Sequence, residues 1–139
     1  GGLSADREQL FLYKDSGNRF RVVAHPVGET VYVSVEGVPP FRIDIGNPAV
    51  VQDAGWFNAL KSSRTGVVEF LLALRGLQPG ETYIKVTDGK GATYTVPHSV
   101  WKTRLDAPAT VESNSTMVST VKTGDKLTPC DNTALKNLR

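Results

Sequence analysis

The chain has 139 residues, and its 16 basic and 14 acidic side chains give a formal net charge of +2 at neutral pH. Apolar residues make up 40% of it, so a single domain of this length can bury an ordinary core without a metal or a disulfide. The balanced charge argues against nucleic acid as a partner, and no apolar run approaches the roughly 20 residues that cross a bilayer.

Alternation of apolar and polar residues predicts short β-strands along the N-terminal half of the chain. Successive side chains on a strand point to opposite faces, so this alternation gives one buried face and one face in water. Val31, Val33 and Val35 show the pattern clearly. Turn-forming residues, such as Asp-Ser-Gly-Asn at 15–18, separate the segments. We expect strands near residues 9–14, 20–24, 31–35 and 41–45.

Residues 50–61 break this pattern because they show no period of two. We expect a short helical turn or an irregular crossover between sheets, although Gly55 disfavours a helix by about 1 kcal/mol. Trp56 and Phe57 are adjacent, so on a strand they cannot both face the core. One ring is therefore either exposed, as an anchor for a partner, or covers an open end of the fold.

The clearest signal is a β-hairpin between residues 76 and 96. A Pro79-Gly80 turn leads into a strand with Ile84 and Val86, and the Asp-Gly-Lys-Gly turn at 88–91 reverses it into a second strand. A longer alternating stripe precedes the hairpin at 68–74. About seven short strands, with turns about every ten residues, predict an all-β, antiparallel sandwich.

The composition changes after Trp101, which closes the last expected strand. Residues 102–139 are rich in Thr, Ser, Asn and Asp and poor in large apolar side chains. We therefore divide the chain into a sandwich at 1–101 and a polar C-terminal arm or extra hairpin at 102–139. An arm that becomes ordered on a partner is the preferred interpretation, and a linker to a following domain is the alternative. Asp131 is placed to cap a short final helix that ends at Leu138.

An ordered set of turn and strand residues between 19 and 100 resembles the bacterial immunoglobulin-like (Big-type) domain. Its parts are a glycine, a proline pair and an aromatic, an Asn-Pro step, a Pro-Gly turn, a Thr-x-Ile-x-Val strand, an Asp-x-x-Gly turn and a closing strand. The matching residues are Gly37, Pro39, Pro40, Phe41, Asn47, Pro48, Gly76, Pro79, Gly80, Thr82, Ile84, Val86, Asp88, Gly91, Thr93 and Thr95. The resemblance implies an immunoglobulin-like sandwich, from which the Trp56-Phe57 region departs. The Asn-Pro step and Pro-Gly turn also resemble the periplasmic N-terminal domain of secretins.

The acids and histidines form no recognisable catalytic motif. Asp44 and Asp53 come nearest to a hydrolytic carboxylate pair, but Asp44 is expected to face solvent from a strand. His25, His98 and Cys130 lack both the short spacing of a zinc site and a catalytic signature. We therefore expect no enzyme activity.

No cofactor or metal is expected either. The turn at Asp88 suggests calcium, which Big-type domains sometimes bind, but Lys90 opposes a cation and a tight hairpin explains the turn. Cys130 cannot form an internal disulfide, because it is the only cysteine, and is either a solvent-facing or semi-buried thiol or an intermolecular link.

These observations predict a non-enzymatic structural or binding module of an extracellular assembly, such as an adhesin, an appendage or a virion protein. The alternative is a periplasmic subunit of a pilus or secretion machine, and an inhibitor is a third class. A protein partner or neighbouring subunit is expected, with a glycan as a further candidate. Trp56, Phe57 and Trp101 are the residues predicted to bind it.

Overall fold

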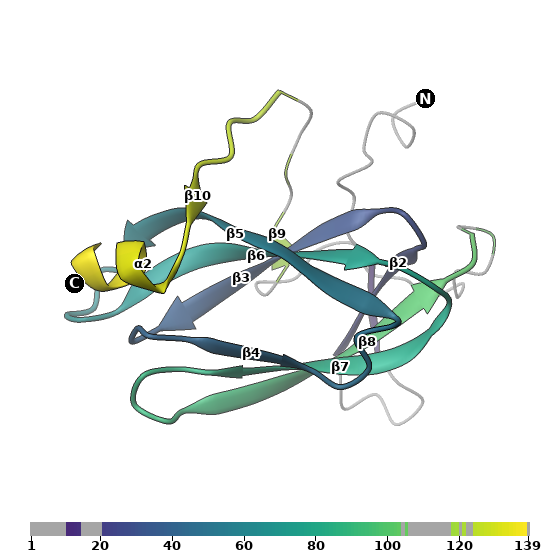
Figure 1. Cartoon of the computed structure of the whole chain (residues 1–139), viewed down its shortest axis with the longest axis horizontal. Helices are drawn as coiled ribbons and strands as arrows, with labels where there is room; N and C mark the ends of the chain where they lie inside the picture. The colour runs from purple at the N-terminus through teal and green to yellow at the C-terminus, as the bar shows by residue number, and fades with distance from the viewer. Residues whose placement is uncertain are drawn as a thin grey trace.

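Two β-sheets packed face to face make up the computed structural model, which describes residues 11–14, 21–103, 105, 118–119, 121 and 124–138. In Figure 1, β5, β6 and β3 belong to the upper layer, and β4, β7 and β8 belong to the lower layer. The expected all-β sandwich is therefore confirmed.

The lower layer, sheet A, has the strand order β1-β2-β8-β7-β4. Strands β7 and β8 form the hairpin expected from the sequence, with Thr87 paired to Thr93 beside its turn. Every pairing in this sheet is antiparallel except β2–β8, which joins the β1–β2 pair to the rest of the sheet. The strand bounds are β1 (Phe11–Lys14), β2 (Arg21–Pro26), β8 (Thr93–Trp101), β7 (Gly80–Thr87) and β4 (Arg42–Ile45).

The upper layer, sheet B, has the order β10-β5-β6-β3-β9 and is antiparallel throughout. Long strands form its centre and two short strands form its edges. The bounds are β10 (Pro129–Cys130), β5 (Val51–Lys61), β6 (Val68–Gly76), β3 (Thr30–Gly37) and β9 (Val118–Ser119).

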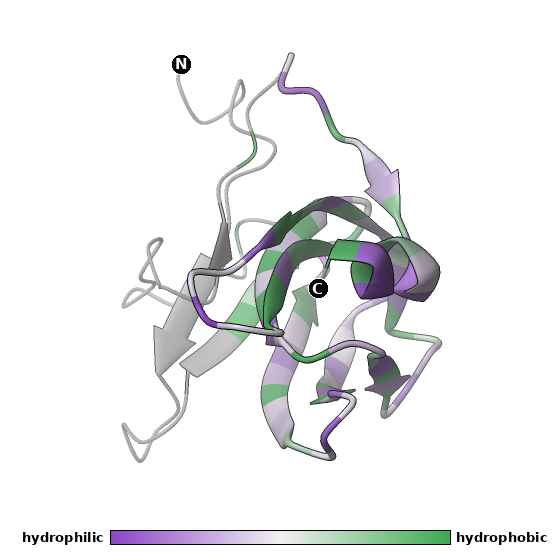
Figure 2. Ribbon diagram, turned by 90° about the vertical axis from the view of Figure 1, so that its left-hand side faces the viewer, coloured by the Kyte–Doolittle hydropathy of each residue, from purple (hydrophilic) through white to green (hydrophobic). Residues whose placement is uncertain are grey.

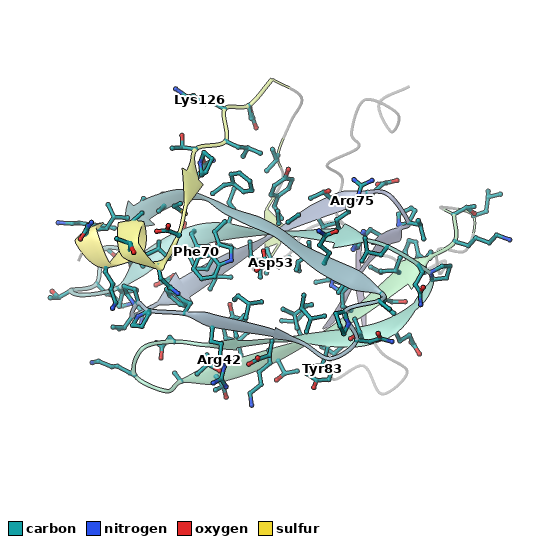
Figure 3. The ribbon with its side chains drawn as sticks, in the orientation of Figure 1. Arg42, Asp53, Phe70, Arg75, Tyr83 and Lys126 are labelled. Atoms are coloured by element: carbon teal, nitrogen blue, oxygen red, sulfur yellow. The ribbon has the colours of Figure 1, made fainter. Side chains whose placement is uncertain are left out.

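The core lies between the sheets and is filled mainly by β-branched and aromatic side chains. Figure 2 shows the alternation along the strands as bands of hydrophobic and hydrophilic colour. Val31, Val33 and Val35 are buried on β3, as the period of two predicts. Phe70 of β6 is 1% exposed and lies between the layers (Figure 3). Burying such a side chain stabilises the fold by about 2–3 kcal/mol.

Residues 51–61 form strand β5, between β10 and β6, rather than the helical turn or crossover that we expected. β5 pairs with β6, but its register shifts by one residue between Asp53 and Trp56 and again between Phe57 and Leu60. Each shift is a β-bulge, which inserts one residue and resets which face the following side chains occupy. Gly55 and Asn58 carry the positive φ angles, 114° and 57°, at these two places. The bulges thus explain why the sequence shows no period of two.

The described part of the C-terminal segment between residues 124 and 138 includes a strand and a helix that pack onto the sandwich. β10 pairs with the edge of β5, and the following helix α2 (Asn132–Leu138) buries Leu135 completely. The N–H of Ala134 donates to Asp131 Oδ1 at 3.0 Å, so the predicted cap and helix are confirmed. No helix in the described ranges is long and apolar enough to cross a membrane. Residues 106–117 lie outside the described residues.

Replacing Leu135 by Ala tests whether α2 is part of the folded unit. The substitution leaves a cavity under the helix and is expected to lower the free energy of unfolding by about 2–5 kcal/mol. Lys136→Ala, on the exposed side of the same helix, is the matched control and should change it by less than about 0.5 kcal/mol. Urea unfolding measures both, and equal, near-zero effects would show that the helix adds nothing to stability.

Candidate partner-binding groove

The first bulge of β5 fixes the position of Trp56. Asp53 accepts a hydrogen bond from the N–H of Gly55 at 2.9 Å and another from the indole Nε1 of Trp56 at 3.2 Å. The indole ring stacks on Phe70, with ring centroids 4.8 Å apart and planes 26° from parallel. One face of the indole is therefore held against the core, and the half-buried ring also lines a surface groove.

The other two predicted anchors lie elsewhere. Phe57 is half-buried and pairs in register with Leu71 and with Pro129 of β10. Trp101 is only 7% exposed at the end of β8, so its ring is packed within the molecule. The structure thus does not bring the three aromatics together, and only Trp56 lines the groove.

The C-terminal segment supplies the other wall of this groove, which has a volume of about 540 Å³. Asp53, Gly55 and Trp56 come from β5, and the remaining lining residues are Cys130, Asp131, Asn132 and Thr133. A second hollow of about 420 Å³ shares Cys130 and lies along Asn58, Ala59 and α2. Sequence reasoning singled out Cys130 as a candidate intermolecular link and Asp131 as a helix cap, but it did not place residues 130–133 beside Trp56.

Asn132 connects the groove to the free edge of sheet A. Its side-chain oxygen accepts the N–H of Phe41 at 2.7 Å, and its Nδ2 donates to the carbonyl oxygen of Phe41 at 2.9 Å. An amide side chain that pairs with both backbone groups of one residue imitates a neighbouring strand. The groove therefore reaches the beginning of β4.

On β4, alternate residues direct their backbone N–H and C=O groups away from the partner strand β7. The N–H of Gly46 donates to the carbonyl oxygen of Tyr83 on β7, whereas the N–H of Phe41 donates to the side-chain oxygen of Asn132. Because strand residues alternate in direction, Ile43 and Ile45 aim their N–H and C=O groups away from β7. Among the described strands, none pairs with that side of β4. Figure 1 shows β4 in the lower layer and β5 in the upper layer, and the two strands are in contact.

The groove is acidic. Asp53 and Asp131 are both exposed, and neither Lys nor Arg occurs among the described residues that line it. Burial raises the pKa of the Cys130 thiol, the hydrogen bond with Ala59 lowers it, and the nearby charge of Asp131 raises it again. The net pKa is above the ordinary value, so the thiol stays protonated near neutral pH and is a weak nucleophile.

The remaining sequence candidates have structural roles. Asp44 forms an ion pair with Arg42 at 2.9 Å, and it lies in sheet A whereas Asp53 lies in sheet B. Among the described residues, no three His, Cys, Asp or Glu side chains are placed to hold a metal ion.

Asp88 organises the hairpin turn. Its carboxylate accepts the N–H groups of Val38, Lys90 and Ala92 at 2.9–3.1 Å. Burial raises the pKa of Asp88, but these hydrogen bonds outweigh it and leave the pKa below its ordinary value. The carboxylate is thus committed to backbone donors, which accounts for an acidic residue in this turn.

Gly55→Ala tests whether the first bulge positions Trp56. An added Cβ would lie 3.1 Å from ring atoms of Phe57, and alanine would have to adopt a positive φ that L-residues disfavour. We therefore expect the free energy of unfolding to fall by about 1–3 kcal/mol and the tryptophan emission to shift. Gly66→Ala is the control, since Gly66 also has positive φ but no atom within 4 Å of the added Cβ. It should lose stability without changing the emission. Identical spectra for the two variants would contradict the assignment.

Comparison of the chain with protein-family models, with curated proteins and with solved structures finds no match. The resemblance to Big-type domains therefore rests on the turn and strand residues alone. Any assignment of function has to come from the groove and the strand edges of this chain.

Proposed function

We propose that this chain is a non-enzymatic binding module of an extracellular assembly, and that its groove beside Trp56 holds an extended, basic segment of a protein partner. The observation that carries the proposal is the groove itself. It combines a fixed aromatic ring, two exposed carboxylates and an adjoining strand edge.

Charge complementarity selects a basic partner. Asp53 and Asp131 put two negative charges in a groove whose described lining has no positive charge, although the whole chain carries +2. A Lys or Arg side chain would pair with these carboxylates and could also lie against the indole of Trp56. An acidic segment would meet like charge and no compensating cation.

The edge of β4 selects an extended partner. Ile43 and Ile45 offer backbone donors and acceptors on the side away from β7, and a strand added there would satisfy them. Main-chain pairing supplies affinity in this mode, while pockets for alternate side chains supply specificity. The groove beside β5 is the pocket that such a strand would meet.

The reactive groups of the chain favour binding over catalysis. The histidines are 0% and 1% exposed, so a substrate in solution does not reach them. The thiol of Cys130 in the groove has a raised pKa rather than the lowered pKa of a nucleophile.

Fluorescence anisotropy with a short labelled peptide that alternates Lys with Val tests the proposal. The peptide should bind, and the double variant Asp53→Asn and Asp131→Asn should weaken binding about tenfold, since each exposed charge pair contributes up to about 1 kcal/mol. Asn at position 131 still caps α2. Asn at position 53 has one acceptor oxygen for the N–H groups of Gly55 and Trp56, so Asp131→Asn alone, with an expected loss of about threefold, separates the effect of charge from the placement of Trp56. Glu81→Gln removes an exposed charge from β7 and should leave the affinity unchanged.

Two further peptides make the test decisive. A peptide with Glu in place of Lys should not bind, and a Lys peptide that is N-methylated at alternate residues should lose binding because it cannot pair as a strand. Equal affinity for the Lys and Glu peptides would refute the acidic groove. Equal affinity for the methylated and unmethylated Lys peptides would refute strand addition.

A further inference from the structure

Two histidines from distant parts of the sequence meet in the core. His25 on β2 and His98 on β8 have their Nε2 atoms 2.6 Å apart, and the rings are nearly perpendicular at a centroid distance of 4.7 Å. One Nε2 must carry a hydrogen and the other must accept it. A second hydrogen at this contact would place two N–H groups against each other. A proton added instead to a buried Nδ1 would leave that N–H without an acceptor, because neither Nδ1 has a hydrogen-bond partner in the described structure, so the closed form favours a neutral pair.

The surroundings offer no support for a charged imidazole. The buried Nδ1 of His98 has no hydrogen-bond partner within the described structure. His98 lines a small void whose other walls are the apolar residues of four strands and Tyr94. Burial raises the pKa of Tyr94 to about 12, so the phenol is neutral and gives no counter-charge.

The strands β3, β6 and β7 direct no carboxylate toward the pair, and Glu29, in the turn after β2, contacts His25 through its backbone. On β3, β6 and β7 the inward positions are apolar, and the ionisable residues alternate to the outer faces. These outward residues are Tyr32, Glu36, Glu69, Arg75, Glu81, Tyr83 and Lys85. On β4, Arg42 and Asp44 pair with each other.

Burial lowers the pKa of His25 to about 4, although backbone hydrogen bonds at Glu29 and Pro26 act to raise it. Burial and then the charge of His25 lower the pKa of His98 well below its ordinary value.

The pair lies at the joint that holds the N-terminal strands. β2 pairs with β8 at four positions, from Val23–His98 to Pro26–Trp101, whereas β7 pairs with β8 at eight. β1 pairs only with β2 within the described sheet. Gly76 packs against this joint so closely that an added Cβ would lie 3.0 Å from Pro26 O and 3.2 Å from His25 Cε1. If β2 detaches from β8, β1 detaches with it, and the backbone groups of β8 that paired with β2 become exposed.

We infer that the His25–His98 pair is an acid-sensitive latch, whose protonation releases the β1–β2 ribbon from sheet A and exposes the edge of β8. The sign follows from proton linkage. Above the ordinary histidine pKa of about 6.5 both the open and closed forms are neutral, so the latch holds. Below it the open form binds protons that the closed form excludes, so opening becomes more favourable until the pH reaches the lowered pKa of the closed form near 4.

Hydrogen exchange at pH 7.5 and pH 5.0, corrected for the intrinsic rates, measures this opening. Two histidines that titrate only in the open form should raise the opening constant at residues 23–25 roughly a thousandfold. The amides of β3 and β6 serve as internal controls and should keep their protection. Unchanged protection of residues 23–25 would overturn the latch, and so would parallel loss in β2, β3 and β6, which indicates global unfolding.

Glutamine variants test how many histidines take up a proton when the β1–β2 ribbon opens. His98→Gln leaves one titrating histidine and should reduce the effect of the same pH change to roughly thirtyfold. The double variant His25→Gln and His98→Gln should remove it, because two amides can still share a hydrogen bond but bind no proton. A thousandfold effect that persists in His98→Gln would assign the acid response to other groups. If the double variant does not fold, the single variant and the regional exchange of the unaltered chain still decide the question.

Discussion

The ring of Phe70 holds the two sheets together on the side where the groove lies. Phe41 packs against it edge-on from the start of β4, with centroids 5.0 Å apart, and Trp56 stacks on it from β5. Aromatic pairs of this kind contribute about 0.5–1.5 kcal/mol beyond the area that they bury. Both walls of the groove depend on this cluster, because Phe41 carries the backbone groups that Asn132 binds.

The fold was largely predictable because its signals are local. The hairpin around Asp88 and the alternating valines of β3 each depend on residues within a few positions of one another, and the structure has both as expected. The path of β5 was not predictable from a period of two, because the bulges at Gly55 and Asn58 each add a residue and reverse the faces. Strands with two bulges look irregular in sequence although they pair almost throughout.

The candidate groove was only partly predictable, and for a different reason. Trp56 stood out as a large ring in an irregular segment, but its partners Cys130, Asp131 and Asn132 follow more than 70 residues later. The composition of the C-terminal segment is polar, which indicated an arm. Leu135 alone gives α2 its fully buried contact, and a single apolar residue in a polar segment is too weak a signal to predict docking.

The histidine pair shows how acid could act on one joint without acting on the whole sandwich. Among the described buried residues, His25, His98 and Ser99 are the only polar ones, and all three lie on β2 or β8. Two valines there would need no hydrogen bond and would not respond to pH. The other buried side chains in the described core carry no group that gains a proton between pH 7.5 and 5, so acid has no comparable group to act on there. The groove contains no histidine and is lined by β5 of sheet B and by the C-terminal segment. Its Asn132 contacts Phe41 beside β4, which is at the opposite edge of sheet A from β1 and β2. The proposed partner binding and the inferred ribbon release therefore involve separate parts of the same sandwich, so release at β2 need not disturb a partner held along β4.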